Sequence, residues 1–187
     1  MNHPLKLGGI LFCITALCVG ILSIVNQVTA PIIATNEVKS EEEAMRALVT
    51  DAESFITVDQ IDSDAVKKVC IAQKDEKTVG YVVRMEPNGY GGAIKMLIGL
   101  DTMGCVKGIR ILEHAETPGF GANAEKESFK NQFINCKTPI EVTKGTPNAN
   151  QIQAITGATI TSNAIAEAVN VASEYVMSHE AQWGDKQ

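Results

Sequence analysis

Four hydroxyl side chains lie within residues 156–162, which read Thr-Gly-Ala-Thr-Ile-Thr-Ser. An apolar pattern with helical spacing follows directly, so this run is expected at the start of a helix. The first turn of a helix carries N–H groups without an intrahelical partner and a partial positive charge. Gly157 lets the backbone pass close to a ligand. These features together predict an anion site, and phosphate is the anion that fits it best.

Two further segments are rich in glycine. Asn-Gly-Tyr-Gly-Gly occupies residues 88–92, and Glu-Thr-Pro-Gly-Phe-Gly occupies residues 116–121. Neither is a P-loop, because no Gly-Lys-Ser/Thr follows, and neither has the strand and helix that flank a dinucleotide-binding fingerprint. Taken singly, each segment is explained by the preference of glycine for turns.

Taken together, the three segments resemble the FMN-binding domain of the Rnf and Nqr respiratory complexes. The resemblance is carried by Thr-Gly-Ala-Thr at 156–159, Glu-Thr-Pro-Gly-x-Gly at 116–121 and Gly-Tyr-Gly-Gly at 89–92. It extends over nearly the whole chain, including an apolar N-terminal segment. The chain has 187 residues, a length that favours the G-subunit family of Rnf, the ion-translocating ferredoxin:NAD oxidoreductase, over the longer C subunit of Nqr.

The resemblance implies that FMN is joined through its phosphate to Thr159 by a separate flavin transferase. It also implies which other residues contact the cofactor. Glu116, Thr117 and Phe120 are expected along the isoalloxazine ring. The remaining expected contacts are Thr156, Gly157 and Ala158 beside Thr159, Tyr90, and Gly119 and Gly121, where glycine permits close approach of the backbone.

Lys144 is a further expected contact, because a cation near N1 and C2=O of the ring would stabilise the anionic reduced flavin. The alternative for Lys144 is a surface lysine before a turn. One position departs from the transferase recognition pattern, which has an acidic residue six positions before the modified threonine where this chain has Gln153. If that acidic residue is indispensable, Thr159 stays bare and its hydroxyl only caps the helix.

Residues 7–25 contain no charged side chain and are long enough to cross a bilayer, which takes about 20 apolar residues. Lys6 precedes this run and acidic residues follow from Glu37, so the positive-inside rule places the N-terminus in the cytoplasm and the rest outside. A cleaved signal peptide is the alternative, since residues 28–30 resemble a cleavage site, but the length of the run and Pro31 favour a retained anchor. We expect a cytoplasmic N-terminus at 1–6, a span in the lipid bilayer at 7–28, a linker and helix at 29–60, and an extracytoplasmic FMN-binding domain at 61–187.

The body of the chain indicates an α+β fold, an antiparallel sheet with packed helices. Four β-rich runs at 66–73, 78–86, 93–101 and 106–114 are joined by short polar or glycine-containing links, as in an antiparallel meander. Helices are expected at 37–51, at 124–134 and from 161 or 162 to about 178, and a short strand at 140–143. The last helix carries an apolar stripe made of Ile165, Val169, Ala172 and Val176.

Composition excludes several classes of function. The formal net charge is −6 and no cluster of Lys and Arg occurs, which argues against nucleic acid as a partner. Five cysteines without a Cys-x-x-Cys pair argue against a disulfide framework and a cysteine-ligated cluster. His114 has no partner at ligand spacing, so no metal is expected, and no triad or carboxylate pair indicates hydrolysis.

The resemblance therefore implies an electron-transfer subunit of a membrane-bound Rnf complex, with no catalytic residue and no complete reaction of its own. Its partners would be the other membrane subunits and the flavin transferase. An Nqr-type subunit and a free-standing anchored flavodomain are the redox alternatives. An alternative from another class is a membrane-anchored binding or assembly protein whose threonine run only caps a helix.

Overall fold

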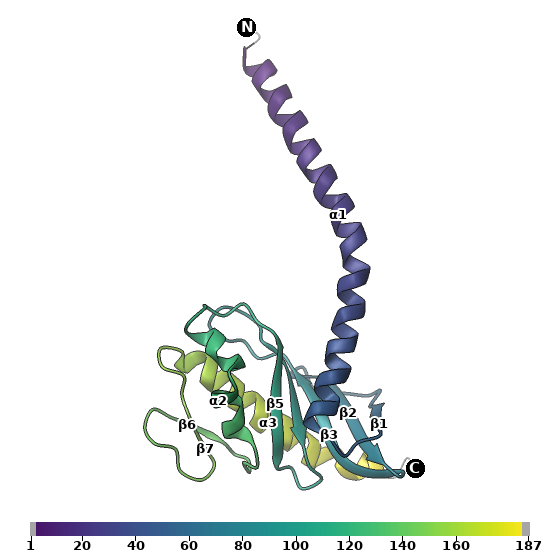
Figure 1. Cartoon of the computed structure of the whole chain (residues 1–187), viewed down its shortest axis with the longest axis vertical. Coiled ribbons are helices and arrows are strands. Elements are labelled where there is room, and N and C mark those ends of the chain that lie inside the picture. The colour runs from purple at the N-terminus through teal and green to yellow at the C-terminus, as the bar shows by residue number, and fades with distance from the viewer. Residues whose placement is uncertain (1–2, 185–187) are drawn as a thin grey trace. The chain divides into compact units, whose positions relative to one another are not determined.

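The computed structural model describes residues 3–184. They divide into two compact units, one that extends to Glu41 and one that begins at Glu42. Figure 1 shows the helices and strands of both units.

Helix α1 runs from His3 to Leu48 and is long and apolar enough to cross a membrane by its length and composition. Two threonines within it donate their hydroxyls to carbonyl oxygens one turn earlier, Thr15 to Leu11 at 3.0 Å and Thr29 to Val25 at 2.9 Å. These polar groups are therefore satisfied without water, as a membrane segment requires. The expected helix at 37–51 is not a separate element, because the helix continues through Pro31 although proline removes one backbone hydrogen bond.

Five antiparallel strands form a sheet in the order β1-β2-β3-β4-β5. The last four strands confirm the expected meander: β2 (Val66–Lys74), β3 (Lys77–Met85), β4 (Lys95–Leu100) and β5 (Val106–Glu113). Strand β1 (Ser54–Thr57) was not expected, because four residues with one half-buried side chain carry too little pattern to be recognised.

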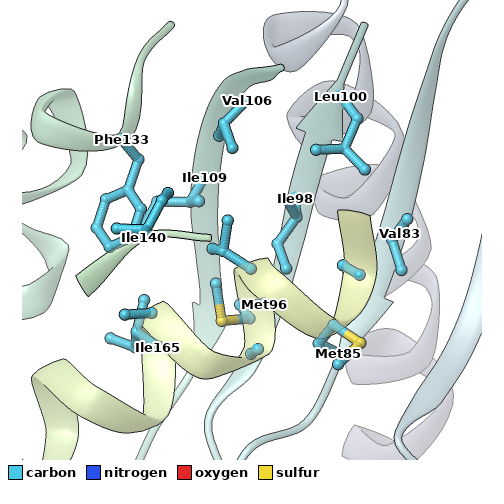
Figure 2. Packing of buried hydrophobic residues seen from close by; sticks show 14 of the residues in the cluster. Val83, Met85, Met96, Ile98, Leu100, Val106, Ile109, Phe133, Ile140 and Ile165 are labelled. Atoms are coloured by element: carbon cyan, nitrogen blue, oxygen red, sulfur yellow. The ribbon is translucent and has the colours of Figure 1, made fainter. Parts of the chain in front are cut away.

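The two faces of the sheet are both covered, and alternate residues of each strand point to opposite faces. Val69 and Ile71 of β2 lie in the larger core cluster, whereas Cys70 and Ala72 lie in the smaller one. The smaller cluster is completed by Ala44, Met45 and Leu48 at the end of α1 and by Val49. The larger cluster is formed against α3 (Thr159–Gly184), whose Ile165 lies near Met96 in Figure 2. The expected stripe of this helix is confirmed, since Ile165, Val169, Ala172 and Val176 are fully buried.

The single helix expected at 124–134 is wrong. Three short pieces replace it: the 3-10 helix η1 (Gly121–Glu125), helix α2 (Glu127–Lys130) and the 3-10 helix η2 (Asn131–Phe133). Lys126 separates the first two with an extended backbone, at ψ 139°. Phe129 and Phe133 nevertheless pack together, as they would on one helix. Both are buried, and their rings meet edge to face at 5.4 Å between centroids.

Two short parallel strands follow, β6 (Glu141–Thr143), close to the expected strand, and β7 (Gln151–Gln153), where no strand was expected. Asn170 of α3 holds the chain just before β6. Its Oδ1 accepts the Ile140 N–H at 2.7 Å, and its Nδ2 donates to the Ile140 carbonyl at 2.9 Å. One side chain therefore satisfies both backbone groups of a buried residue.

We expect Asn170→Ala to lower the free energy of unfolding by about 1–3 kcal/mol, the cost of leaving buried backbone groups unpaired. Urea unfolding of the full chain in detergent, followed by circular dichroism, measures this loss. Asn163→Ala is the matched control, because Asn163 is exposed on the same helix and its loss should change little. Equal stability of the two variants would contradict the prediction.

The C-terminal part of α3 carries aromatic residues that pack against the domain. Trp183 lies 5.9 Å from Tyr81 and 6.2 Å from Tyr175 between ring centroids. The Tyr175 hydroxyl donates to Asp62 Oδ1 at 2.9 Å, which holds the pKa of the Asp62 carboxyl below its ordinary value. These contacts fix the end of α3 to β3 and to the chain between β1 and β2.

Candidate functional site

The three motif segments surround one cavity of about 460 Å³ at the start of α3. The size falls in the usual range for small-molecule sites, about 300–1,000 Å³. Its wall is formed by residue 90 and by residues within the segments 116–121 and 157–161. The lining residues are Tyr90, Glu116, Thr117, Phe120, Gly121, Gly157, Ala158, Thr159, Ile160 and Thr161.

The segment 88–92 reaches the cavity through a tight turn between β3 and β4. Gly89 N–H donates to the Gly92 carbonyl at 2.8 Å, and Asn88 forms an isolated bridge with Ala93. A side chain at Gly91 would lie 2.2 Å from the Ala115 carbonyl oxygen, so only glycine lets the turn pack against residue 115. Tyr90, at the tip, is 73% exposed. The turn therefore presents an aromatic ring at the rim of the cavity.

Glu116 lies buried at the centre of the site, with 6% of its surface exposed. Its Oε1 accepts the Gly91 N–H at 2.8 Å, and its Oε2 accepts the Thr161 hydroxyl at 2.7 Å. Its own N–H donates to His114 Nδ1 at 3.1 Å, and His114 Nε2 lies 3.3 Å from Glu125 Oε1. Glu116 thus joins all three motif segments, and His114 accepts the backbone N–H of Glu116.

Gly157 turns the chain into α3 with φ +77°, a conformation that glycine adopts without steric cost. A Cβ atom at this position would lie 2.7 Å from Cδ1 of Phe120. Phe120 is 53% exposed, so its ring covers the turn and still faces the cavity.

We expect Gly157→Ala to destabilise the protein by about 1–2 kcal/mol, because a non-glycine residue is strained at positive φ. The ring of Phe120 must also move, so Gly157→Ala in a Phe120→Ala background should be less damaging than in the natural chain. Urea unfolding of the single and double variants measures the cost of the positive φ and the cost of moving the Phe120 ring. Gly145→Ala is the control, since no atom lies closer than 3.8 Å to its added Cβ. A loss as large at Gly145 would refute the conformational argument.

The first turn of α3 has a well-ordered cap. Ser162 Oγ donates to the Ala158 carbonyl at 3.0 Å and accepts the Ile155 N–H at 2.9 Å. Within residues 3–184, no acceptor meets the backbone N–H groups of residues 159–161. These donors lie beside the cavity, and the helix dipole makes this end electropositive. The site can therefore hold an anion.

The structure brings together most of the residues expected to contact the cofactor and leaves three of them outside the cavity wall. Thr156 is exposed before the turn, Gly119 forms a turn at φ +82° with open space around it, and Lys144 is exposed beyond β6. Two lining residues were not expected, Ile160 and Thr161. Both belong to the hydroxyl-rich run, so its full length of seven residues was the signal that could have identified them.

Comparison with known families defines the class of protein first. Residues 89–174 match the family model described as the FMN-binding domain, and this range includes every residue of the cavity. The fold is similar to that of the C subunit of the Na⁺-translocating NADH-quinone reductase from Parabacteroides distasonis, with a TM-score of 0.53 and 23% identity over 67% of this chain and 76% of that one. The chain thus contains an FMN-binding domain.

The N-terminal part and the relatives define the family more closely. Residues 1–48 match the model described as the RnfG N-terminal region. The G subunit of the proton-translocating ferredoxin:NAD⁺ oxidoreductase complex of Clostridium ljungdahlii is 43% identical over 83% of this chain and 82% of that protein. The G subunit of the Na⁺-translocating ferredoxin:NAD⁺ oxidoreductase complex of Acetobacterium woodii is 35% identical over 89% and 88%. The chain belongs to the family of Rnf complex G subunits.

The residues of the cavity fit FMN. The N–H groups at the start of α3, which have no acceptor among residues 3–184, suit its phosphate. Tyr90, Phe120 and Ile160, all more than half exposed, offer apolar surface to a flat ring system. The donor set and the cavity are therefore those that a phosphate-bearing aromatic cofactor requires.

Proposed function

We propose that the chain is the electron-transfer subunit of an ion-translocating ferredoxin:NAD oxidoreductase complex, with its FMN esterified through the phosphate to Thr159. FMN supplies one-electron transfer chemistry when it is bound. The chain's own part is to hold the cofactor, to fix its orientation and to anchor it at the membrane.

One observation carries the choice of Thr159: among the described residues, no group forms a hydrogen bond with its hydroxyl, unlike the other hydroxyls in the first turn of α3. The Thr161 hydroxyl donates to Glu116, and the Ser162 hydroxyl belongs to the helix cap. Thr159 lines the cavity half-buried, and in the part of the chain that the structure describes its hydroxyl makes no hydrogen bond. Thr156 lies outside the cavity wall, so Thr159 is the residue of the run whose hydroxyl is both accessible and beside the anion site.

The electrostatics of α3 support the same assignment. A phosphodiester at Thr159 keeps one negative charge, which the free N–H groups of the first turn and the helix dipole stabilise. A separate flavin transferase would make the bond. Gln153 lies on β7 with its N–H bonded to Gln132 Oε1 at 2.7 Å, and its side chain is exposed. The position is therefore accessible to a transferase, and we expect modification of the natural chain with glutamine there.

The membrane part of the proposal rests on α1. Residues 7–28 would span the bilayer, with residues 1–6 in the cytoplasm and the FMN-binding domain from residue 61 outside. No ionisable side chain other than the thiols of Cys13 and Cys18 occurs between Leu7 and Asn36, so α1 offers no charged groups for an ion path. Ion movement would belong to the other subunits of the complex, which are the expected partners.

Peptide mapping tests the proposal directly. The full chain is produced together with a flavin transferase, denatured, and cut with trypsin and a glutamate-specific protease to release residues 145–167. We expect this peptide to carry the mass of FMN less one water, with fragmentation placing the addition on Thr159. An unmodified peptide, or an addition on another threonine, would overturn the assignment.

A further inference from the structure

The carboxylate of Glu116 occupies a space that Gly89 and Gly121 leave open. A Cβ at Gly89 would lie 2.2 Å from Glu116 Oε1, and one at Gly121 would lie 2.1 Å from Oε2. A Cβ at Gly91 would lie 3.1 Å from the Glu116 Cα. Each distance below 3.0 Å is too short for real atoms, so the two outer glycines make room for this carboxylate. Room for a cofactor is not needed to explain them.

The same carboxylate links segments that no strand or helix joins. Gly91 lies 25 residues before Glu116, and Thr161 lies 45 residues after it. The two oxygens accept from one backbone N–H and one hydroxyl, so the side chain spans the gap between the turn that carries Tyr90 and the first turn of α3. A buried side chain with both oxygens satisfied is held in one position.

We propose that Glu116 is a positioning residue, which fixes the Tyr90 turn against the first turn of α3 and so sets the two sides of the cavity relative to each other. It acts through its length and its two acceptor oxygens, not as a contact along the flavin ring. The bridge exists in the chain without cofactor. Only its consequence for FMN rests on the proposed function.

Three substitutions at Glu116 separate bridging from charge. Glu116→Gln keeps the length: its Oε1 can accept from Gly91, and its Nε2 can donate to the Thr161 oxygen. Glu116→Asp keeps the charge but is one methylene shorter, so it cannot reach both partners within hydrogen-bond distance. Glu116→Ala removes both bonds. Glu125→Gln is the control, since Glu125 is exposed and meets only His114 nearby among the described residues.

The bridge is measured on the full, flavin-free chain in detergent micelles, made in a host without the transferase. Carbonyl-¹³C tyrosine with ¹⁵N glycine marks the Gly91 amide alone, because residues 90–91 form the only Tyr-Gly pair in the sequence. We expect amide exchange at Gly91 to stay within about twofold of the natural rate in Glu116→Gln and Glu125→Gln. In Glu116→Asp and Glu116→Ala it should rise about tenfold, as for loss of one hydrogen bond.

Two results would overturn the positioning role: natural protection in Glu116→Asp, or lost protection in Glu116→Gln. If Glu116→Ala fails to fold, the comparison of Glu116→Asp with Glu116→Gln still decides.

A second measurement uses the protein with flavin attached, in which the visible circular dichroism of the flavin should change in Glu116→Asp and not in Glu116→Gln. Unchanged dichroism in Glu116→Asp, with protection lost, would show that the bridge does not orient the cofactor. Absence of flavin from the natural chain would contradict the proposed function, but it would leave the positioning role of Glu116 standing.

Discussion

Thr159→Ala is expected to abolish covalent flavin completely. Without the hydroxyl no phosphoester can form, and the neighbouring hydroxyls of Thr161 and Ser162 are held in hydrogen bonds. The fold should persist, because Thr159 is only half-buried and alanine suits the first turn of a helix. Fluorescence of the denatured protein in a gel measures the result: the natural chain should retain a fluorescent band, and the variant should show none.

Thr156→Ala is the matched control for this experiment. It removes the same group from the same run, but at an exposed position outside the cavity wall. We expect its band to remain fluorescent, and circular dichroism should show that both variants are folded. A fluorescent Thr159→Ala band would place the link elsewhere and refute the assignment.

Phe133→Ala is expected to cause the largest loss of stability, about 3–5 kcal/mol, as for other buried aromatic residues cut to alanine. Phe133 is fully buried, and Figure 2 shows its ring beside Ile109 and Ile140. Removal of the ring leaves a cavity where η2 packs against β5. Urea unfolding of the full chain in detergent gives the difference, with the slope of the transition checked for a single cooperative step.

The adjacent Ile134→Ala provides the comparison. Ile134 is 44% exposed, and we expect its loss to change stability by less than about 1 kcal/mol. The Phe133 substitution should also disturb the start of α3 beside the cavity. Gln132, in the same turn as Phe133, accepts the backbone N–H of Gln153, which lies shortly before α3. Similar losses for the two variants would show that the core of this region is not centred on Phe133.

The fold was largely predictable because its strongest signals are local. The meander and the buried stripe of α3 follow from side-chain periods of two and 3.6, which the sequence displays directly. The helix at 124–134 failed because the spacing of Phe129 and Phe133 satisfies a continuous helix and also a chain of short turns. The extended backbone at Lys126, which decides between them, leaves no pattern in the sequence.

Most residues of the site were predictable from the sequence, but the hydrogen bonds that join them were not. Motif resemblance placed Glu116 along the ring of a cofactor and Gly121 where the backbone approaches it closely, and both residues line the cavity. In the structure the carboxylate of Glu116 bridges Gly91 and Thr161, and Gly121 makes room for it. Such a role depends on three segments meeting in space, and nothing in the spacing of one segment reveals it.

The enclosure of Glu116 constrains the order in which this site can change during evolution. Gly89 has an ordinary backbone conformation, and a side chain there is blocked by Glu116 Oε1 and by the end of the Ile94 side chain. The bridging carboxylate cannot move without breaking its hydrogen bonds to Gly91 and Thr161. A larger residue at position 89 therefore becomes acceptable only after position 116 has shortened, so we expect a lineage that carries a larger residue at position 89 to carry a shorter one at position 116 as well.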